Sequence, residues 1–196
     1  MIIDLIYLDA WAGGSFDRLL RKDGVDTSYY NDRITGEVVP AVNRLVDAVR
    51  DQGGPVLWVK VSISLPNSRD WIPARRNKSK DLGLCRPGTE NYETIPGLIV
   101  KPADYIVPKK CTSAFWGGNA GAILRHRGVK NVLVAGCITN GGVLVNAVDA
   151  ANNNFDVTIV DDGCAALSQE LHQAALTLLP NLYAVGTAEQ IVADFT

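Results

Sequence analysis

A chain of 196 residues with 47% hydrophobic and 20% charged residues can bury the core of one domain, and we expect residues 1–196 to form a single domain. The formal net charge of −2 provides no basic field to attract nucleic acid or an anionic membrane. No apolar run approaches the roughly 20 residues of a membrane span. The apolar N-terminus lacks the basic segment of a signal peptide, so we expect a cytoplasmic protein.

Apolar runs alternate with helical patterns along the chain. Strands are predicted over 5–8, 56–59, 105–107, 132–135, 157–160 and 183–185. Helices are predicted over 38–49, 119–127, 140–152, 169–179 and from 188 onward. The remaining long stretches, 10–35 and 64–100, are predicted to be irregular and to wall a pocket.

This alternation predicts an α/β fold, a three-layer sandwich with a doubly wound, mostly parallel six-stranded sheet. In such sheets ligands bind beyond the carboxyl ends of the strands, where the strand order reverses. The residues that follow predicted strands are therefore candidates for a site, namely Asp9, the Lys109-Lys110 pair and the turn 136–142. By position alone Asp9 is equally well a helix cap, and a lysine at a strand end is more often only solvated.

The cysteines and histidines argue against a metal centre. Four cysteines are scattered without a CxxC pair or Cys/His spacing, and the chain has only two histidines. Free thiols in a reducing compartment are the simplest explanation. We therefore expect neither a metal nor a cofactor.

Four segments, in order along the chain, resemble the isochorismatase-like hydrolases of the cysteine hydrolase superfamily. The segment KKCTSAF at 109–115 is similar to the family's K-x-x-x-S-A-F and places the family lysine on Lys109. GCITNGGV at 136–143, followed by Asp149-Ala150, resembles G-x-x-T-[DN]-x-C-V, and DDGCAA at 161–166 resembles D-x-C-A. Asp9 stands where the family has D-x-Q, with Trp11 in place of the Gln.

The resemblance implies a catalytic set in which an Asp accepts a thiol proton, a Lys holds the thiolate and a Cys attacks an amide. It also implies backbone N–H groups that bind an oxyanion in the turn containing Ile138 and Gly141, with a cis peptide bond between Cys137 and Ile138. The nucleophile position is Gly142 in this chain, so thioester chemistry cannot start there. Cys137 is better explained as a small buried hydrophobe, and Cys111 and Cys164 are poor replacements for the nucleophile.

Isochorismatases proper also carry Gly at this position and hydrolyse a vinyl ether by acid catalysis. The first hypothesis is therefore a hydrolase of isochorismate or a similar small enol ether or cyclic acid, with Asp9 as general acid and Lys109 as orienting charge. Two sets of residues would complete the substrate site. Substrate carboxylates would bind Arg75, Arg76 or Arg86, and the apolar wall would be Trp11, Phe115 and Trp116, although core packing explains these aromatics equally well.

Two other classes of function stay open. The pair Thr139-Asn140 is typical of the amidase branch, which indicates a cysteine-type amide or C–N hydrolase whose nucleophile was lost or replaced. The third hypothesis is a non-catalytic member of the family that binds a small-molecule ligand. The resemblance also implies a homo-oligomer, a dimer or tetramer, with neither nucleic acid nor membrane as a partner.

Overall fold

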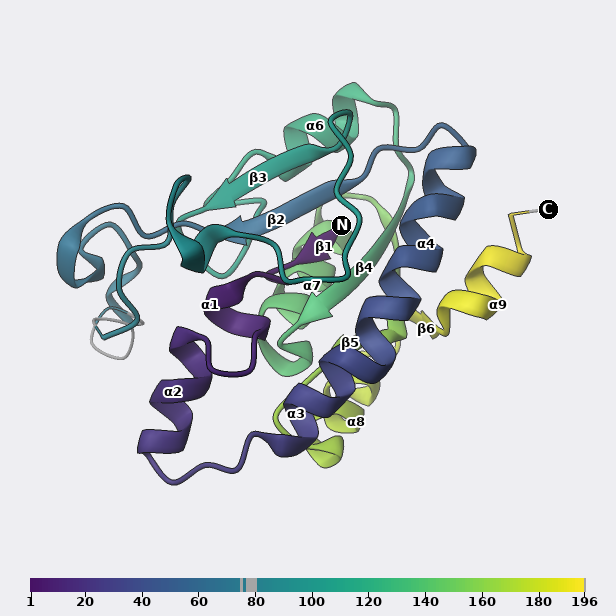
Figure 1. Cartoon of the computed structure of the whole chain (residues 1–196). Coiled ribbons are helices and arrows are strands. Elements are labelled where there is room, and N and C mark those ends of the chain that lie inside the picture. Colours follow the sequence, from purple (N-terminus) through teal and green to yellow (C-terminus); the bar gives the residue numbers. More distant parts are fainter. Residues whose placement is uncertain (75, 77–80, 196) are drawn as a thin grey trace.

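The computed structural model describes residues 1–74, 76 and 81–195, and these residues form a sheet of six parallel strands (Figure 1). The strands are β1 (Ile2–Ile3), β2 (Leu57–Val61), β3 (Tyr105–Lys109), β4 (Asn131–Cys137), β5 (Asp156–Ala165) and β6 (Ala184–Gly186). Their order is β3-β2-β1-β4-β5-β6, so the direction of winding reverses between β1 and β4. The predicted doubly wound α/β fold is confirmed.

Helices cover both faces of the sheet, and Figure 1 shows α4 and α9 together on one of them. The helices that pack against the sheet are α4 (Val39–Asp51), α6 (Ala120–His126), α7 (Leu144–Asn152), α8 (Gln169–Thr177) and α9 (Ala188–Ala193). Right-handed crossovers place α6, α7 and α8 on the face opposite α4. In the described part of the chain, no helix is both long and apolar enough to span a membrane.

The connections contain further short helices. They are α1 (Tyr7–Ala10), α2 (Ser15–Lys22), α3 (Ser28–Arg33), the π-helical turns η1 (Ile34–Val38) and η4 (Thr139–Val143), and the 3-10 turns η2 (Pro66–Ser68) and η3 (Glu90–Tyr92). The prediction that 10–35 is irregular is therefore wrong, because α2 and α3 occupy most of it. Between β2 and β3 the described chain is largely irregular, as predicted.

The first strand lies earlier than the predicted strand 5–8. It ends at Ile3, and Asp4 adopts a φ of 52°, which turns the chain out of the sheet and toward α1. The apolar run is buried all the same, because Leu5 packs in the main core while Ile6 and Leu8 pack in a second, smaller cluster. Burial without sheet pairing explains why the pattern resembled a strand.

Close contact between β1 and β4 brings their carboxyl ends together. Gly136 has a φ of 121°, and a Cβ atom at this position would lie 2.1 Å from the carbonyl oxygen of Ile3. Beyond this contact, the Cys137 thiol donates to the carbonyl of Asp4 at 3.1 Å. The residue that follows β1 and the turn that follows β4 are thus neighbours.

Asp104 fixes the start of β3. Its carboxylate accepts hydrogen bonds from Arg50 Nη2 (2.6 Å), Trp58 Nε1 (2.9 Å) and the backbone N–H of Lys101 (2.8 Å). Burial acts to raise the pKa of Asp104, but these hydrogen bonds outweigh it and the pKa is lowered. The other end of the same strand carries Lys109, so this contact helps to position the site described below.

Replacing Asp104 with Ala should lower the free energy of unfolding by about 2–3 kcal/mol, because it leaves the N–H of the buried Trp58 without its acceptor and removes the buried carboxylate that Arg50 contacts. Urea denaturation measures the effect. Asp47→Ala is a matched control, because Asp47 pairs with the same arginine but its side chain is 49% exposed. We expect this control to cost less than about 0.5 kcal/mol. Equal losses in the two variants would contradict the role given to Asp104.

Candidate active site

A cavity of about 300 Å³ opens at the carboxyl edge of the sheet, where the strand order reverses. The ends of β1 to β4 contribute to its floor, and Phe16, Trp71 and Leu167 contribute apolar wall from three separate connections. The position agrees with the rule for doubly wound sheets, in which ligands bind beyond the strand ends at the switch point.

A buried ion pair lies at the base of this cavity. Lys109 Nζ is 2.7 Å from Asp4 Oδ2, and the two side chains are 2% and 9% exposed. The other carboxylate oxygen, Asp4 Oδ1, accepts the backbone N–H of Val61 at 2.9 Å, so one aspartate joins the ends of β1, β2 and β3. The Lys109 ammonium also lies 5.7 Å from the centre of the Trp71 ring. This arrangement holds the Lys109 and Asp4 side chains together where both are almost completely buried.

Asp4, and not Asp9, is therefore the aspartate that follows the first strand and pairs with Lys109. The sequence does not separate the two aspartates, because each follows apolar residues and neither is followed by Gln two positions later. Asp9 lies in α1, is half-buried and lines the same cavity. Tyr30 Oη donates to its backbone carbonyl at 2.9 Å, which ties α1 to α3. The cavity thus presents two carboxyl groups and one ammonium.

The turn after β4 forms one side of the cavity through Ile138, Asn140, Gly141 and Gly142. The peptide bond between Cys137 and Ile138 is cis, as the resemblance implied. The Ile138 carbonyl accepts the backbone N–H groups of Gly141 (2.9 Å) and Val143 (3.2 Å), which closes the turn.

Gly142 lies beside the ion pair, where there is little room for a side chain. A Cβ atom at this position would lie 3.3 Å from Asp4 Oδ2 and 3.1 Å from both the Cys137 carbonyl and Ile3 Cγ2. These distances are tighter than ordinary van der Waals contact, so a side chain here would require its neighbours to shift. It would also point at the carboxylate that pairs with Lys109.

Asn146, on the first turns of α7, is a site residue that sequence reasoning missed. Its side chain is completely buried, donates to the carbonyls of Gly142 (2.7 Å) and Thr112 (3.1 Å), and accepts the N–H of Ala114 (2.8 Å). It therefore joins the turn to the segment that follows Lys109. A polar residue on the buried face of a predicted helix was the available signal.

Cys137, Cys164 and Cys111 do not have the surroundings of a reactive thiol in the cavity. Cys137 lines the cavity, but burial raises the pKa of its thiol well above the ordinary value, and the charges of Asp9 and Asp4 raise it further. Cys164 is buried in the main core, and burial raises its pKa as well. Cys111 is half-buried but does not line the cavity; its thiol donates to the carbonyl of Ser113.

Several predicted substrate contacts lie elsewhere. Trp116 is 80% exposed, Phe115 packs against Phe155 with ring centres 6.1 Å apart, and Trp11 packs against Tyr7 at 5.2 Å. None of the three predicted aromatics belongs to the described lining, so the structure does not bring the predicted apolar wall to this cavity. The apolar wall is supplied instead by Phe16 of α2 and by Trp71, which lie in the two stretches that were predicted to be irregular.

The predicted arginine contacts are not part of the described lining either. Arg86 is exposed in a turn, where its backbone N–H donates to Thr89 Oγ1. Arg76 is half-buried, and its guanidinium donates to the carbonyls of Arg69 and Trp71. Arg75 lies outside the described residues. Within the part of the chain that is described, no three His, Cys, Asp or Glu side chains are grouped to bind a metal ion.

Lys110 anchors the segment that carries Trp71. Its ammonium contacts Asp70 Oδ2 (2.5 Å) and Ser64 Oγ (2.9 Å), and Asp70 also accepts the N–H groups of Ser64 and Leu65. Burial opposes ionisation of Asp70, but the hydrogen bonds from Lys110 and the backbone outweigh it and lower the pKa to about 2. The neighbouring lysines thus have different roles, with Lys109 in the cavity and Lys110 outside it.

Lys110→Gln should raise the pKa of Asp70 toward its ordinary value of 3.8, because the variant loses the positive charge that favours the carboxylate. A carboxyl titration followed by ¹³C NMR measures this. In the wild type the pair stabilises the fold above the unfolded-state pKa, and the stabilisation is lost as the pH falls toward 2. Lys101→Gln, at an ion pair with Asp47, should leave the Asp70 titration unchanged. An unchanged midpoint in Lys110→Gln would contradict the assignment.

A doubly wound parallel sheet with an Asp–Lys ion pair beside the turn after β4 is the architecture of an isochorismatase-like hydrolase. The sequence profile of the Isochorismatase domain matches residues 27–190. The chain therefore belongs to the isochorismatase family of hydrolases.

Relatives within this family carry several descriptions. The ureidoacrylate amidohydrolase RutB of Methylobacterium radiotolerans is 28% identical over 197 residues, which covers 93% of this chain and 73% of the relative. A probable inactive nicotinamidase of Arabidopsis thaliana is 31% identical over 149 residues, which covers 74% and 76%. Among solved structures, a cysteine hydrolase from Pseudomonas syringae pv. phaseolicola superposes with a TM-score of 0.80 at 19% identity and covers 99% and 90%, which shows the shared fold.

Proposed function

We propose that this protein is a small-molecule hydrolase in which water, and not a protein thiol, attacks the substrate. The observation that carries the proposal is the geometry at Gly142. The position that would hold a thiol has no side chain, while Asp4 and Lys109 remain paired beside it. An acid–base site without a nucleophilic side chain can hydrolyse a bond that is activated by protonation.

The two carboxyl groups of the cavity suit different roles. Asp4 contacts the Lys109 ammonium and accepts a backbone N–H, and both interactions favour its ionised form. Asp9 is the second carboxyl group of the cavity. The described lining of the cavity contains two carboxyl groups and one ammonium group. Because Lys109 contacts Asp4, we assign the role of proton donor to Asp9.

For an enol ether the reaction then balances with these groups alone. Asp9 delivers its proton to the terminal enol carbon, which leaves an oxocarbenium ion at the ether carbon. Water adds to that carbon and gives up one proton to a carboxylate of the site. The resulting hemiketal breaks its C–O bond to release an alcohol and a ketone. Isochorismate would yield pyruvate and a dihydroxycyclohexadiene carboxylate.

With isochorismate as substrate, Asp9→Asn should lower kcat by at least about 100-fold, because the amide cannot deliver the proton. Pyruvate release, coupled to lactate dehydrogenase, measures turnover. Asp32→Asn, at an exposed site on α3, is the matched control and should leave kcat unchanged. Equal turnover in wild type and Asp9→Asn would contradict the role of Asp9. Tight binding of isochorismate without turnover, measured by calorimetry, would favour a non-catalytic binding protein.

Amide hydrolysis is the second candidate, and the similarity to an amidohydrolase together with Thr139-Asn140 favours it. In that case the ancestral thiol stood at position 142 and was lost. Nicotinamide and ureidoacrylate, with ammonia release as the readout, are suitable test substrates.

Gly142→Cys separates the two candidates. If water is the nucleophile, the added side chain should take the place of that water and lower turnover of the enol ether at least tenfold. The tight contacts of its Cβ atom should also lower stability by about 1–2 kcal/mol. Gly36→Ala, whose Cβ would have no neighbour within 4 Å, is the control for a loss of glycine. Appearance of amide hydrolysis in Gly142→Cys would overturn the enol-ether proposal and favour the lost-nucleophile hypothesis.

A further inference from the structure

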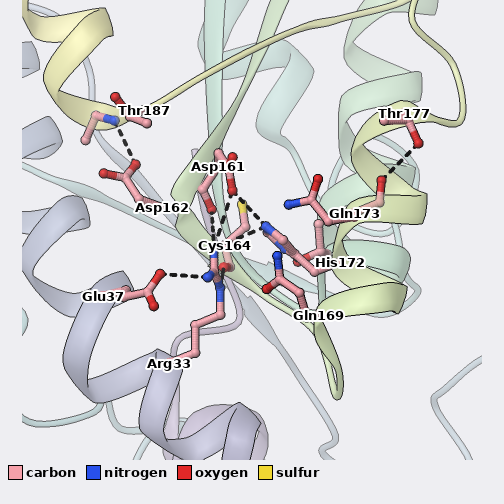
Figure 2. A network of polar contacts seen from close by, with 12 residues as sticks. Arg33, Glu37, Asp161, Asp162, Cys164, Gln169, His172, Gln173, Thr177 and Thr187 are labelled. Atoms are coloured by element: carbon pink, nitrogen blue, oxygen red, sulfur yellow. Dashed lines mark hydrogen bonds and ion pairs between the residues drawn. The ribbon is translucent and has the colours of Figure 1, made fainter.

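A polar network connects α3, β5 and α8 to the turn η4, and Figure 2 shows the part of it around Arg33, Asp161 and His172. His172 of α8 is completely buried, and its Nδ1 lies 2.9 Å from Oγ1 of Thr139, the first residue of the turn η4. Its Nε2 lies 2.8 Å from Asp161 Oδ1 of β5. Arg33 of α3 approaches from the other side and contacts both His172 and Asp161.

The partners of His172 determine which ring nitrogen carries the proton. Asp161 Oδ1 is an acceptor in this network, because it lies 2.8 Å from Nε2 and also accepts from Arg33 Nη2 at 3.4 Å. This geometry assigns a ring proton to Nε2, where it points at Asp161 and leaves Nδ1 to face Thr139. Arg33 Nη2 has its own acceptors in the carbonyl (3.1 Å) and Oδ1 (3.4 Å) of Asp161, so it does not need the lone pair of Nε2.

This tautomer leaves a lone pair on Nδ1, which accepts the hydroxyl proton of Thr139. Thr139 is completely buried, so its hydroxyl group cannot exchange this partner for bulk water. Arg33 is fixed in turn by the carbonyl of Cys164 (2.8 Å) and by Glu37 (2.6 Å). The chain of hydrogen bonds thus runs from α3 through β5 and α8 to the first residue of the turn.

We infer that His172 is a positioning residue that acts through Thr139 to hold the turn carrying Gly142 against the Asp4–Lys109 pair. Asn146 holds the carbonyl of Gly142 at the other end of the same turn. Between these two anchors lie Asn140 and Gly141, which line the cavity. His172 itself does not line the cavity, so it contacts no substrate.

Thr139→Val tests the inference, because valine keeps the shape of threonine and removes the hydroxyl group. Hydrogen exchange of the Gly141 and Val143 amides, which donate to the Ile138 carbonyl, should become at least tenfold faster. In ¹⁵N-histidine spectra the Nδ1 resonance of His172 should move downfield and Nε2 should stay protonated. The chain has only two histidines, and the exposed His126 is an internal reference. Thr139→Ser should restore both readouts.

Thr177→Val is the matched control, because this threonine lies on the same helix as His172 but bonds only to carbonyls of its own helix. It should change neither the exchange of the turn amides nor the His172 spectrum. Unchanged exchange in Thr139→Val, or a wild-type His172 protonated on Nδ1 alone, would overturn the inference.

The kinetic consequence rests on the proposed function. With isochorismate, Thr139→Val should lower kcat at least tenfold with KM within twofold of wild type, and Thr139→Ser should recover kcat. A rise in KM at constant kcat would contradict a positioning role. The exchange and NMR readouts need no substrate, so failure of the proposed reaction and failure of this inference are distinguishable.

Discussion

An ammonium group that is almost completely buried requires a counter-charge within contact distance, because an unpaired buried charge costs several kcal/mol. Asp4 provides that charge for Lys109, and the requirement explains much of the surrounding architecture. The aspartate must follow β1, which is central in the sheet, and the lysine must end β3, two strands away. Asp4 reaches across by leaving the sheet in a left-handed conformation and by binding the backbone at the end of β2. The ion pair therefore joins three strand ends into one rigid floor.

The second constraint is the position of the turn after β4 relative to that floor. The Gly136 contact brings β4 against β1, so the turn begins within hydrogen-bond distance of Asp4. Two buried polar side chains then hold its ends, Asn146 from α7 and His172, through Thr139, from α8. Buried polar groups of this kind are specific because each has few alternative partners. Residues outside the glycine-rich segment TNGGV in this way hold it in one conformation.

Much of the fold and part of the site could be predicted from the sequence. Lys109 and the turn were found because they lie in segments with distinctive spacing, and the apolar strands that precede them are unambiguous. Asp4 was missed because only Ile2 and Ile3 form its strand, whereas the longer apolar run 5–8 looks more like a strand and yet packs outside the sheet. Trp71 and Phe16 were missed for another reason: they lie in long connections, and their approach to the cavity depends on tertiary contacts such as that of Lys110 with Asp70.

The space beside Asp4 also bears on how such a chain could change over evolutionary time. In this backbone the Cβ direction of Gly142 meets the carbonyl of Cys137, the methyl group of Ile3 and the carboxylate of Asp4, all closer than side chains normally approach. A cysteine placed here would need these neighbours to give way by a few tenths of an ångström, and they belong to the ends of β1 and β4. A change of side chain at position 142 is therefore coupled to the residues of those two strand ends. The glycine and the floor of the cavity would be expected to change together.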